Sequence, residues 1–246
     1  MKALVTGASS GIGYDICIEL YKRGVEIVAV GRNKQRLKDL QSKIGCEIVS
    51  TDLSKRENCL KLYEDVKNVD ILINNAGFGD VGFFTETDLE KELLMIDTNI
   101  TAMHILAKLY LKDMTKNNFG YILNTASIAS FLTGPFMATY YSTKAYVLKL
   151  TQAIGYEIKK QKKNVYIGAL CPGPVATGFD SVAGVTFSLK AISSEKVAHI
   201  AVKKMFNKKA TIIPTFSIKL GCLAGKILPS RVVCFFTYKS QKKKKS

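Results

Sequence analysis

The sequence lacks the cysteine and histidine spacings that bind metal ions. Its six cysteines include no C-x-x-C pair, and neither of its two histidines, His104 and His199, has a partner at ligand spacing. We therefore expect no metal site, no disulfide framework, and packing or surface roles for both histidines. No signal peptide precedes the cysteines, and a strand pattern begins within the first residues. The expected compartment is the reducing cytoplasm.

Long uncharged runs and C-terminal acidic residues are also missing. Beyond residue 210, Lys219, Lys226 and Arg231 interrupt the apolar stretches before any reaches the roughly 20 residues of a membrane span. All 20 Asp and Glu residues lie before residue 196, whereas 13 of the 36 Lys and Arg residues lie after residue 195. The net charge of +16 is therefore concentrated in the C-terminal fifth. This pattern favours a tail that contacts an anionic surface over a body that binds a specific nucleic acid.

Short apolar runs alternate with amphipathic stretches along most of the chain. The apolar runs predict buried strands at residues 3–6, 26–30, 47–50, 70–73, 121–124 and 165–170, with helices between them, the first at 14–23. This alternation predicts an α/β fold: a single doubly wound, Rossmann-type domain whose parallel sheet is flanked by helices. We expect this domain to span residues 1–214 and a basic amphipathic extension to span 215–246.

A glycine-rich turn connects the first strand to the first helix. Glycines let the backbone approach a pyrophosphate closely, and the N–H groups and dipole of the following helix attract the anion. The turn predicts a dinucleotide site, the alternative being a simple tight turn. The candidate cofactor-binding residues here are Gly7, Ser9, Ser10, Gly11, Ile12 and Gly13.

The end of the second strand bears on the choice of cofactor. Where an NAD site normally has an acid against the ribose 2′-hydroxyl, this chain has Arg32, and the next acid is Asp39. A guanidinium can hold the 2′-phosphate of NADP with several donors, so Arg32 predicts NADP; the alternative is a solvated turn residue. Asp52, at the end of the third strand, is either an adenine contact or a helix N-cap.

Tyr140 and Lys144 lie four residues apart in a helical stretch and therefore share one helix face. A phenol with its ordinary pKa of about 10 is a poor base at neutral pH, but a nearby ammonium favours the phenolate. The pair predicts a proton-transferring site in which Lys144 lowers the pKa of Tyr140. The alternative is a surface pair. Tyr141 has Ala145 at the same spacing and is interpreted as a packing residue.

Several motifs in order resemble the classical short-chain dehydrogenase/reductase family over residues 1–214. Besides the glycine-rich turn, they are the segment 74–77 with the sequence Asn-Asn-Ala-Gly, Ser127 at thirteen residues before Tyr140, and the Pro-Gly stretch at 171–177. Asn99 falls where the family has a catalytic asparagine. The tail from residue 215 resembles that of the long-chain 3-oxoacyl/17β-hydroxysteroid reductase branch.

The resemblance implies an NADP-dependent oxidoreductase that transfers a hydride between nicotinamide and a carbonyl or secondary alcohol. Tyr140 would be the general acid/base, Ser127 would hydrogen-bond the substrate oxygen, Lys144 would hold the nicotinamide ribose, and Asn99 would seat a relay water. The resemblance adds these cofactor-binding residues: Asn75, Ala76, Gly77, Tyr140, Lys144, Pro172, Gly173 and Thr177. It also implies a homodimer or homotetramer. A non-catalytic nucleotide-binding redox sensor or scaffold is the alternative.

The segments expected around the substrate are apolar. Residues 179–192, in the position of the family's substrate loop, include one acid and one base. Further apolar residues between Ser127 and Tyr140 are Phe131, Leu132, Pro135, Phe136 and Met137. They predict a hydrophobic substrate such as a 3-oxoacyl thioester or a steroid-like ketone, the alternative being packing on the body or on another subunit. The basic amphipathic tail predicts peripheral contact with an anionic membrane.

Overall fold

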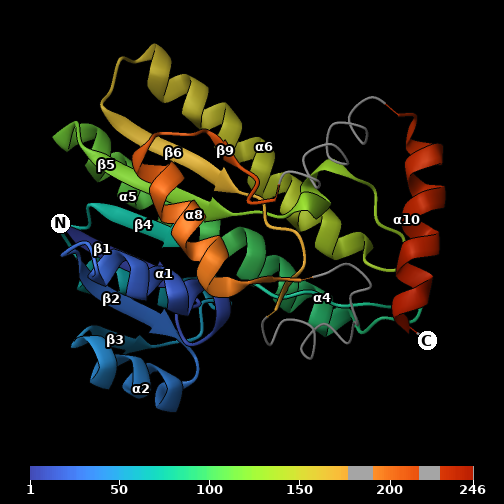
Figure 1. The fold of residues 1–246 in the computed structure, drawn as a ribbon, viewed down its shortest axis with the longest axis horizontal. Helices are drawn as coiled ribbons and strands as arrows, with labels where there is room; N and C mark the ends of the chain where they lie inside the picture. Colours follow the sequence, from blue (N-terminus) through green and yellow to red (C-terminus); the bar gives the residue numbers. More distant parts are fainter. Residues whose placement is uncertain (177–190, 216–227, 246) are drawn as a thin grey trace.

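A parallel sheet of seven strands forms the centre of the molecule (Figure 1). The structure is a computed structural model, and it describes residues 1–176, 191–215 and 228–245. The strand order is β3-β2-β1-β4-β5-β6-β9, so the order reverses between β1 and β4. The strands are β1 (Lys2–Thr6), β2 (Glu26–Gly31), β3 (Glu47–Ser50), β4 (Ile71–Asn74), β5 (Gly120–Thr125), β6 (Val165–Leu170) and β9 (Thr211–Ile212). This arrangement confirms the predicted doubly wound fold.

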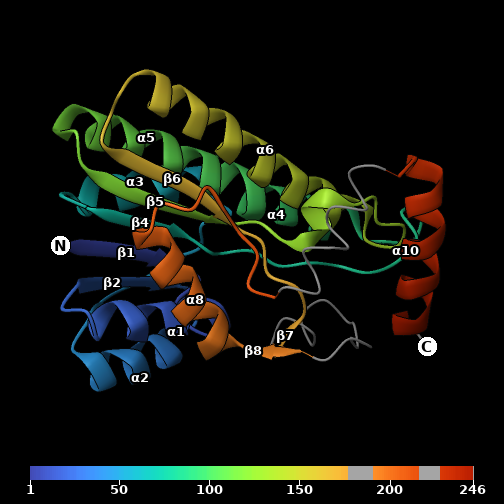
Figure 2. The same ribbon diagram turned by 45° about the horizontal axis from the view of Figure 1, so that its top comes forward.

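Helices cover both faces of the sheet, as Figure 2 shows from a second direction. One face packs against α1 (Gly11–Tyr21), α2 (Lys34–Ile44) and α8 (Ser194–Phe206). The other packs against α3 (Arg56–Asp65), α5 (Met103–Asn117) and α6 (Ala138–Lys160). Within β1, Ala3 and Val5 face the first layer and Leu4 faces the second, and all three are fully buried. A strand covered on both faces needs apolar residues at successive positions, which explains the continuous runs in the sequence.

A π-helical turn interrupts the long helical stretch after β4. The stretch begins as α4 (Leu89–Ile96), continues through the π-turn η1 (Asp97–Ala102), and passes into α5. The Asp88 carboxylate caps α4 by accepting hydrogen bonds from the N–H groups of Glu90 and Lys91, at 2.7 and 3.3 Å. Such π-turns widen a helix locally and often occur at functional sites. This one contains Asn99, which brings a predicted site residue to the irregular turn.

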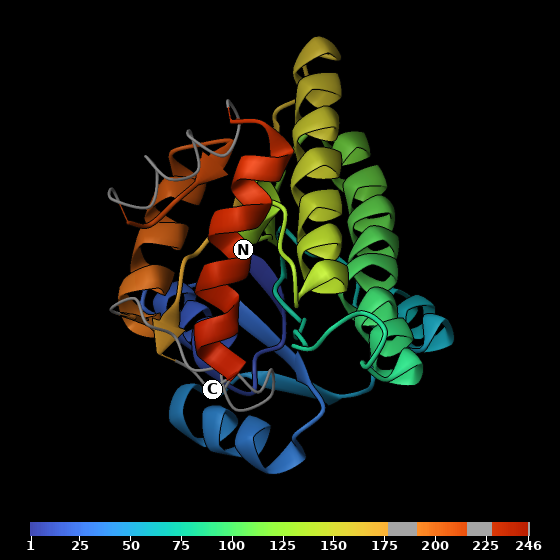
Figure 3. The same cartoon turned by 90° about the vertical axis from the view of Figure 1, so that its right-hand side faces the viewer.

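The remaining described elements gather near the carboxyl ends of the strands. They are the 3-10 turn η2 (Ile128–Phe131), the paired short strands β7 (Val175–Ala176) and β8 (Ile192–Ser193), and the C-terminal helix α10 (Ser230–Lys245). Figure 3 looks onto this end of the molecule and shows α10 crossing in front of it, between α8 and α6. Among the described residues, no helix is both long and apolar enough to span a membrane. The predicted boundary between residues 214 and 215 stays a prediction.

Candidate active site

In the glycine-rich turn, main-chain atoms approach one another closely. Gly7 and Gly11 have φ angles of +66° and +55°, in the left-handed region that favours glycine. A Cβ atom on Gly13 would overlap the Gly7 carbonyl and lie 2.6 Å from Asn75 Nδ2. The helix α1 starts within this turn, so the N–H groups of its first residues have no partners inside the helix. A cradle of this kind, which any side chain at position 13 would fill, fits a dinucleotide pyrophosphate.

Thr6 ties the turn to the neighbouring strand. Its hydroxyl oxygen accepts hydrogen bonds from the N–H groups of Asn75 and Ala76, at 2.9 and 3.0 Å, and its hydroxyl donates to the Ile73 carbonyl at 3.3 Å. Asn75 Oδ1 in turn accepts a hydrogen bond from Thr125 at 3.2 Å. The carboxyl ends of β1, β4 and β5 are therefore joined at the point where the strand order reverses. Thr6 was not among the predicted site residues, although it begins the turn motif.

Gly77, Asn99 and Lys144 converge beside this junction. A Cβ atom on Gly77 would lie 2.7 Å from Asn99 Oδ1 and 3.2 Å from Lys144 Nζ. The Asn99 side chain donates to the Phe78 carbonyl at 2.9 Å and to Thr143 Oγ1 at 3.0 Å, and it accepts from the Phe78 N–H at 3.0 Å. Asn99 thus holds the segment after β4 against the helix that carries Lys144.

Tyr140 and Lys144 lie one turn apart on α6, as their spacing predicts. The Ser127 hydroxyl is hydrogen-bonded to the Tyr140 side chain. Lys144 Nζ donates to the Thr125 carbonyl at 3.0 Å and lies 5.9 Å from the centre of the Tyr140 ring. The structure therefore brings together all four residues predicted to be catalytic, because Asn99 and Lys144 both approach Gly77.

Burial controls the proton affinities of Tyr140 and Lys144. Burial raises the pKa of Tyr140 to about 12, while the hydrogen bond with Ser127 acts in the opposite direction. Burial also lowers the pKa of Lys144 to about 8. The net shift of the Tyr140 pKa is upward because desolvation of the phenol outweighs the hydrogen bond with Ser127. The prediction that Lys144 lowers this pKa stays a prediction. The phenol is consequently protonated at neutral pH and can donate a proton.

Ser130 positions this group and was missed by the sequence reasoning. Its hydroxyl donates to the Lys144 carbonyl at 2.7 Å and accepts from the Ser127 N–H at 3.3 Å. The Ser127 side chain also accepts a hydrogen bond from the Ala129 N–H at 3.1 Å, which caps η2. Ser130 therefore connects the backbone at Ser127 to α6. A serine three residues after the N-cap is a weak signal, since the usual capping box has Glu or Gln there.

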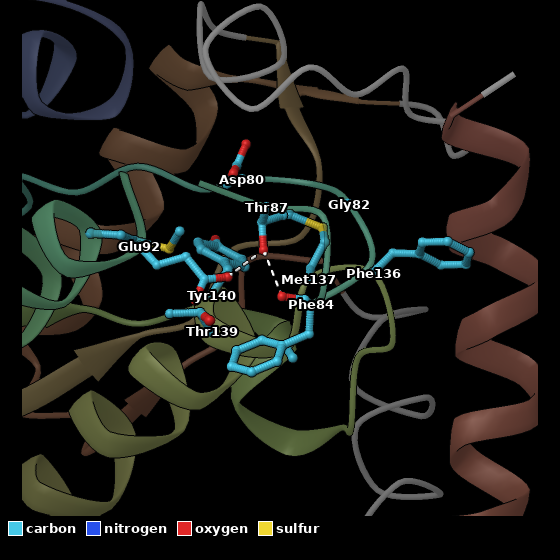
Figure 4. Close-up of a pocket in the computed structure, with 11 residues that line it drawn as sticks. Asp80, Gly82, Phe84, Thr87, Glu92, Phe136, Met137, Thr139 and Tyr140 are labelled. Atoms are coloured by element: carbon cyan, nitrogen blue, oxygen red, sulfur yellow. Dashed lines mark hydrogen bonds between the residues drawn. The ribbon is translucent and has the colours of Figure 1, made fainter. Parts of the chain in front are cut away.

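Tyr140 lines a narrow pocket with a cavity volume of about 10 Å³ (Figure 4). Along one side, the single Thr87 hydroxyl proton is shared between Glu92 Oε1 at 2.7 Å and the Phe84 carbonyl at 3.4 Å. The lining residues are Asp80, Gly82, Phe84, Thr87, Glu92, Met95, Phe136, Met137, Ala138, Thr139 and Tyr140. Two of the five apolar residues expected near the substrate, Phe136 and Met137, are among them. Phe131 instead packs against a core cluster between α5 and α6.

Comparison with known proteins identifies the family. The sequence pattern of the short chain dehydrogenase family matches residues 1–184. The chain belongs to this family. It is 32% identical over 176 residues to the 3-oxoacyl-(acyl-carrier-protein) reductase FabG of Rickettsia prowazekii, covering 70% of this chain and 71% of the relative. This short-chain dehydrogenase is accordingly an NAD(P)-dependent oxidoreductase.

Two solved structures are similar over most of the dehydrogenase. A short-chain dehydrogenase from Sphingobium yanoikuyae, in complex with NADPH, has a TM-score of 0.81 and 28% identity, covering 91% of this chain and 92% of the other. The bulky-bulky ketone specific alcohol dehydrogenase from Comamonas testosteroni has a TM-score of 0.77 and 26% identity, covering 91% and 93%.

The structure also places several of the predicted cofactor-binding residues beyond the glycine-rich turn, and it contradicts one of the two interpretations of Asp52. Arg32 is exposed directly after β2. The N-cap alternative for Asp52 is wrong, because its carboxylate accepts hydrogen bonds from the N–H and hydroxyl of Ser54, at 3.1 and 2.9 Å, and Lys55 is the N-cap of α3. The Pro172 carbonyl accepts from the Ile128 N–H at 3.0 Å, so the segment with Gly173 adjoins η2.

Several predictions fall on residues that the structure does not describe. Thr177 lies outside the described residues. So do residues 179–190 of the expected substrate loop and residues 216–227 of the expected tail. Their predicted roles stay predictions.

The two histidines lie on the surface of the dehydrogenase. His104 Nδ1 is 2.8 Å from the Tyr146 hydroxyl, and His199 Nδ1 is 3.2 Å from Glu19 Oε2. Within residues 1–176, 191–215 and 228–245, no group of three or more His, Cys, Asp or Glu side chains could hold a metal ion. Tyr141 packs over Gly134, and its hydroxyl accepts a hydrogen bond from Gln241, which agrees with the predicted packing role.

Proposed function

We propose that this dehydrogenase uses NADPH to reduce the ketone of a hydrophobic substrate, a 3-oxoacyl thioester or a steroid-like ketone, and can oxidise the corresponding alcohol. The observation that carries the proposal is the Tyr140 phenol, which is hydrogen-bonded to Ser127 and lines a pocket whose wall includes Phe84, Phe136 and Met137. A proton donor beside an apolar wall suits a carbonyl that is attached to an apolar group.

Tyr140 and the residues around it have separate roles in the proposed reaction. Tyr140, protonated at neutral pH, donates its proton to the carbonyl oxygen, and Ser127 donates a hydrogen bond to the same oxygen as negative charge develops there. Lys144 would hold the ribose hydroxyls of the cofactor, and Asn99 would seat a water that returns a proton through Lys144. Bound NADPH supplies the hydride. Tyr140 takes the proton back in the oxidative direction, so oxidation is favoured at alkaline pH.

Arg32 supports NADPH as the preferred cofactor. It follows Gly31, and a Cβ atom on Gly31 would lie 3.2 Å from Ser9 Oγ, so this strand end adjoins the glycine-rich turn. An exposed guanidinium at that edge attracts a 2′-phosphate, which a carboxylate would repel. The similar Sphingobium yanoikuyae enzyme was solved with NADPH. The similarity to a 3-oxoacyl reductase supports a 3-oxoacyl thioester as the first substrate to test.

The test is oxidation of NADPH and NADH at 340 nm by the purified protein. The substrates are an acetoacetyl thioester, a medium-chain 3-oxoacyl thioester, a steroid ketone and a short aldehyde. We expect turnover with NADPH on the medium-chain thioester or on the steroid. Saturable NADPH binding without turnover of any of the four would contradict the proposal and favour a nucleotide-binding sensor or scaffold.

We also propose that residues 215–246 contact an anionic membrane surface. The outward face of α10 exposes the apolar side chains of Val232, Phe235 and Phe236, beside Arg231 and Lys239. Cations flanking an exposed apolar face suit an interfacial helix, since each cation near an anionic surface adds about 1 kcal/mol. Flotation with phosphatidylserine vesicles tests this: binding should fall on deletion of residues 215–246, and unchanged binding would remove the idea.

We propose, in addition, a homodimer or homotetramer, as the family resemblance implies. Size-exclusion chromatography with light scattering gives the mass directly. The 27.1 kDa chain should elute at two or four times its own mass. A monomeric mass at all concentrations would contradict this.

A further inference from the structure

The inner face of α10 contacts the segment that leads into Tyr140. Cys234 Sγ donates to Thr133 Oγ1 at 3.1 Å, and Gln241 Nε2 donates to the Tyr141 hydroxyl at 2.7 Å. Between these two contacts, the Tyr238 ring lies 5.0 Å from the Phe136 ring, centre to centre. Gln241 is only 3% exposed, whereas Tyr238 is 38% exposed, so this face of the helix is packed against the body most fully at Gln241.

Phe136 is held in a conformation that a bulky side chain rarely adopts. Its φ angle is +67°, in the left-handed region. Neighbouring groups must hold such a backbone in place. The Gly82 N–H donates to the Phe136 carbonyl at 2.8 Å, and the Phe83 ring lies 4.5 Å from the Phe136 ring. Tyr238 packs on the Phe136 ring as a second aromatic neighbour, so α10 completes the support.

Phe136 also belongs to the wall of the candidate substrate pocket. The four residues that follow it, ending at Tyr140, line the same pocket. Figure 4 shows the Phe136 side chain extending toward α10. A change at the contact between Tyr238 and Phe136 would therefore reach the pocket wall next to the proton donor. Helix α10 lies outside residues 1–184, the region that matches the family pattern.

We propose that α10 supports the outer wall of the substrate pocket and that Tyr238, acting through Phe136, is a positioning residue that limits the size of the apolar group beside Tyr140. The inference rests on the proposed ketone reduction. It identifies the contact between Tyr238 and Phe136 as the feature that selects among hydrophobic ketones by size. Release of Phe136 from Tyr238 would open the wall toward α10 and admit longer apolar groups.

The same helix offers matched controls. Phe235 and Phe236 are 55% and 62% exposed on the outer face, and their rings lie 5.5 Å apart. Replacing Phe236 by Ala removes an aromatic side chain from α10 and leaves the contact between Tyr238 and Phe136 in place. Tyr238→Phe keeps the ring and removes only the hydroxyl, so it should restore the wild-type behaviour.

The experiment measures kcat/KM with NADPH for 3-oxoacyl thioesters of long and short chain. Tyr238→Ala should raise the long-to-short ratio by about 3- to 10-fold, the size expected for one aromatic contact. Phe236→Ala and Tyr238→Phe should change the ratio by less than about twofold. An unchanged ratio in Tyr238→Ala, or an equal change in Phe236→Ala, would overturn the proposal.

A second readout does not depend on turnover. Amide hydrogen exchange over residues 133–141 should accelerate in Tyr238→Ala and remain at the wild-type rate in Phe236→Ala. If the wild-type protein reduces none of the ketones, the proposed function fails, and exchange still tests the support of the wall by itself. Equal exchange in Tyr238→Ala and the wild type would overturn that support.

Discussion

The nucleotide end and the substrate end of the site are constructed differently. At the nucleotide end, glycines bring main-chain atoms together, as where Gly13 approaches the Gly7 carbonyl. At the substrate end, side chains from distant parts of the chain meet, and Gln241 bonds Tyr141 across 100 positions. A backbone cradle can recur in any chain that keeps its glycines. A wall of side chains changes with each substitution, so substrate selectivity can diverge while cofactor binding persists.

Replacing the proton donor should have the largest effect at the substrate end of the site and almost none at the nucleotide end. Tyr140→Phe should lower kcat by about 10²- to 10⁴-fold, the usual contribution of a general acid, while NADPH affinity stays near the wild-type value. The rate is measured at 340 nm and the affinity by NADPH fluorescence. Tyr146→Phe removes a phenol from the exposed face of the same helix and should leave both unchanged. Turnover retained in Tyr140→Phe would mean that another group transfers the proton.

Lys144 belongs to both the nucleotide end and the substrate end of the site, and burial of its charge lowers the stability of the fold. Its folded-state pKa of about 8 lies below the ordinary value of 10.5, so the unfolded chain binds more protons between these values. Wild-type stability should therefore rise as the pH increases from about 8 to about 10.5. At pH 7, the buried charge costs about 3 kcal/mol relative to the unfolded chain, before its hydrogen bond to Thr125 is considered.

Lys144→Met tests that cost. The variant should lose activity yet gain up to about 3 kcal/mol in free energy of unfolding at pH 7, with a smaller gain at pH 10. Urea unfolding at the two pH values measures the difference. Lys149→Met, on the exposed face of α6, should show no pH-dependent gain. A gain that is equal at pH 7 and pH 10 would contradict the assigned pKa shift.

Arg32→Asp should change the nucleotide end alone. We expect the NADPH-to-NADH preference to fall by about 10- to 100-fold, because a charge-assisted bond to the 2′-phosphate is replaced by repulsion. The ratio of kcat/KM for the two cofactors measures this. Lys112→Asp, an equal charge change on α5, is the control. If the preference survives in Arg32→Asp, then another cation, such as Lys34 or Arg36, holds the phosphate.

Gly13→Ala should disturb the backbone cradle itself. The added methyl group should destabilise the fold by about 1–3 kcal/mol and weaken NADPH binding, because the Gly7 carbonyl must move. Thermal unfolding should show a loss of about 2–4 °C per kcal/mol. Gly155→Ala, where a Cβ would lie an ordinary 3.5 Å from Ile167, should be neutral or slightly stabilising. Equal losses in both variants would contradict the close-approach argument.

The strands of the sheet could be predicted because burial on both faces requires continuous apolar runs. The run at 165–170 coincides with β6, and the run at 26–30 falls one residue short of β2. The two-residue strands β7, β8 and β9 are too short to produce a pattern. Helix α1 begins at Gly11 instead of the expected residue 14, because glycine has a low helix propensity and conceals the first turn.

The candidate site could be predicted where it depends on spacing and not where it depends on burial. The four-residue interval put Tyr140 and Lys144 on one helix face, and motif order indicated Ser127 and Asn99. The direction of the Tyr140 pKa shift depends on desolvation, which only packing determines. Ser130 is indicated only by a weak local signal, a serine three residues after an N-cap. The inner face of α10 acts through contacts between residues about 100 positions apart, so no local pattern indicated it.

The bonds made by Thr6 determine what can be transplanted from this protein. Its hydroxyl group engages main-chain groups 67 to 70 positions further along the chain. A fragment that contains the glycine-rich turn and ends before β4 would keep the motif and lose the groups that anchor it. The turn therefore depends on contacts with β4 and the residues after it to keep its conformation. A graft into another scaffold must include β4 and the two residues after it, with Thr6 facing them.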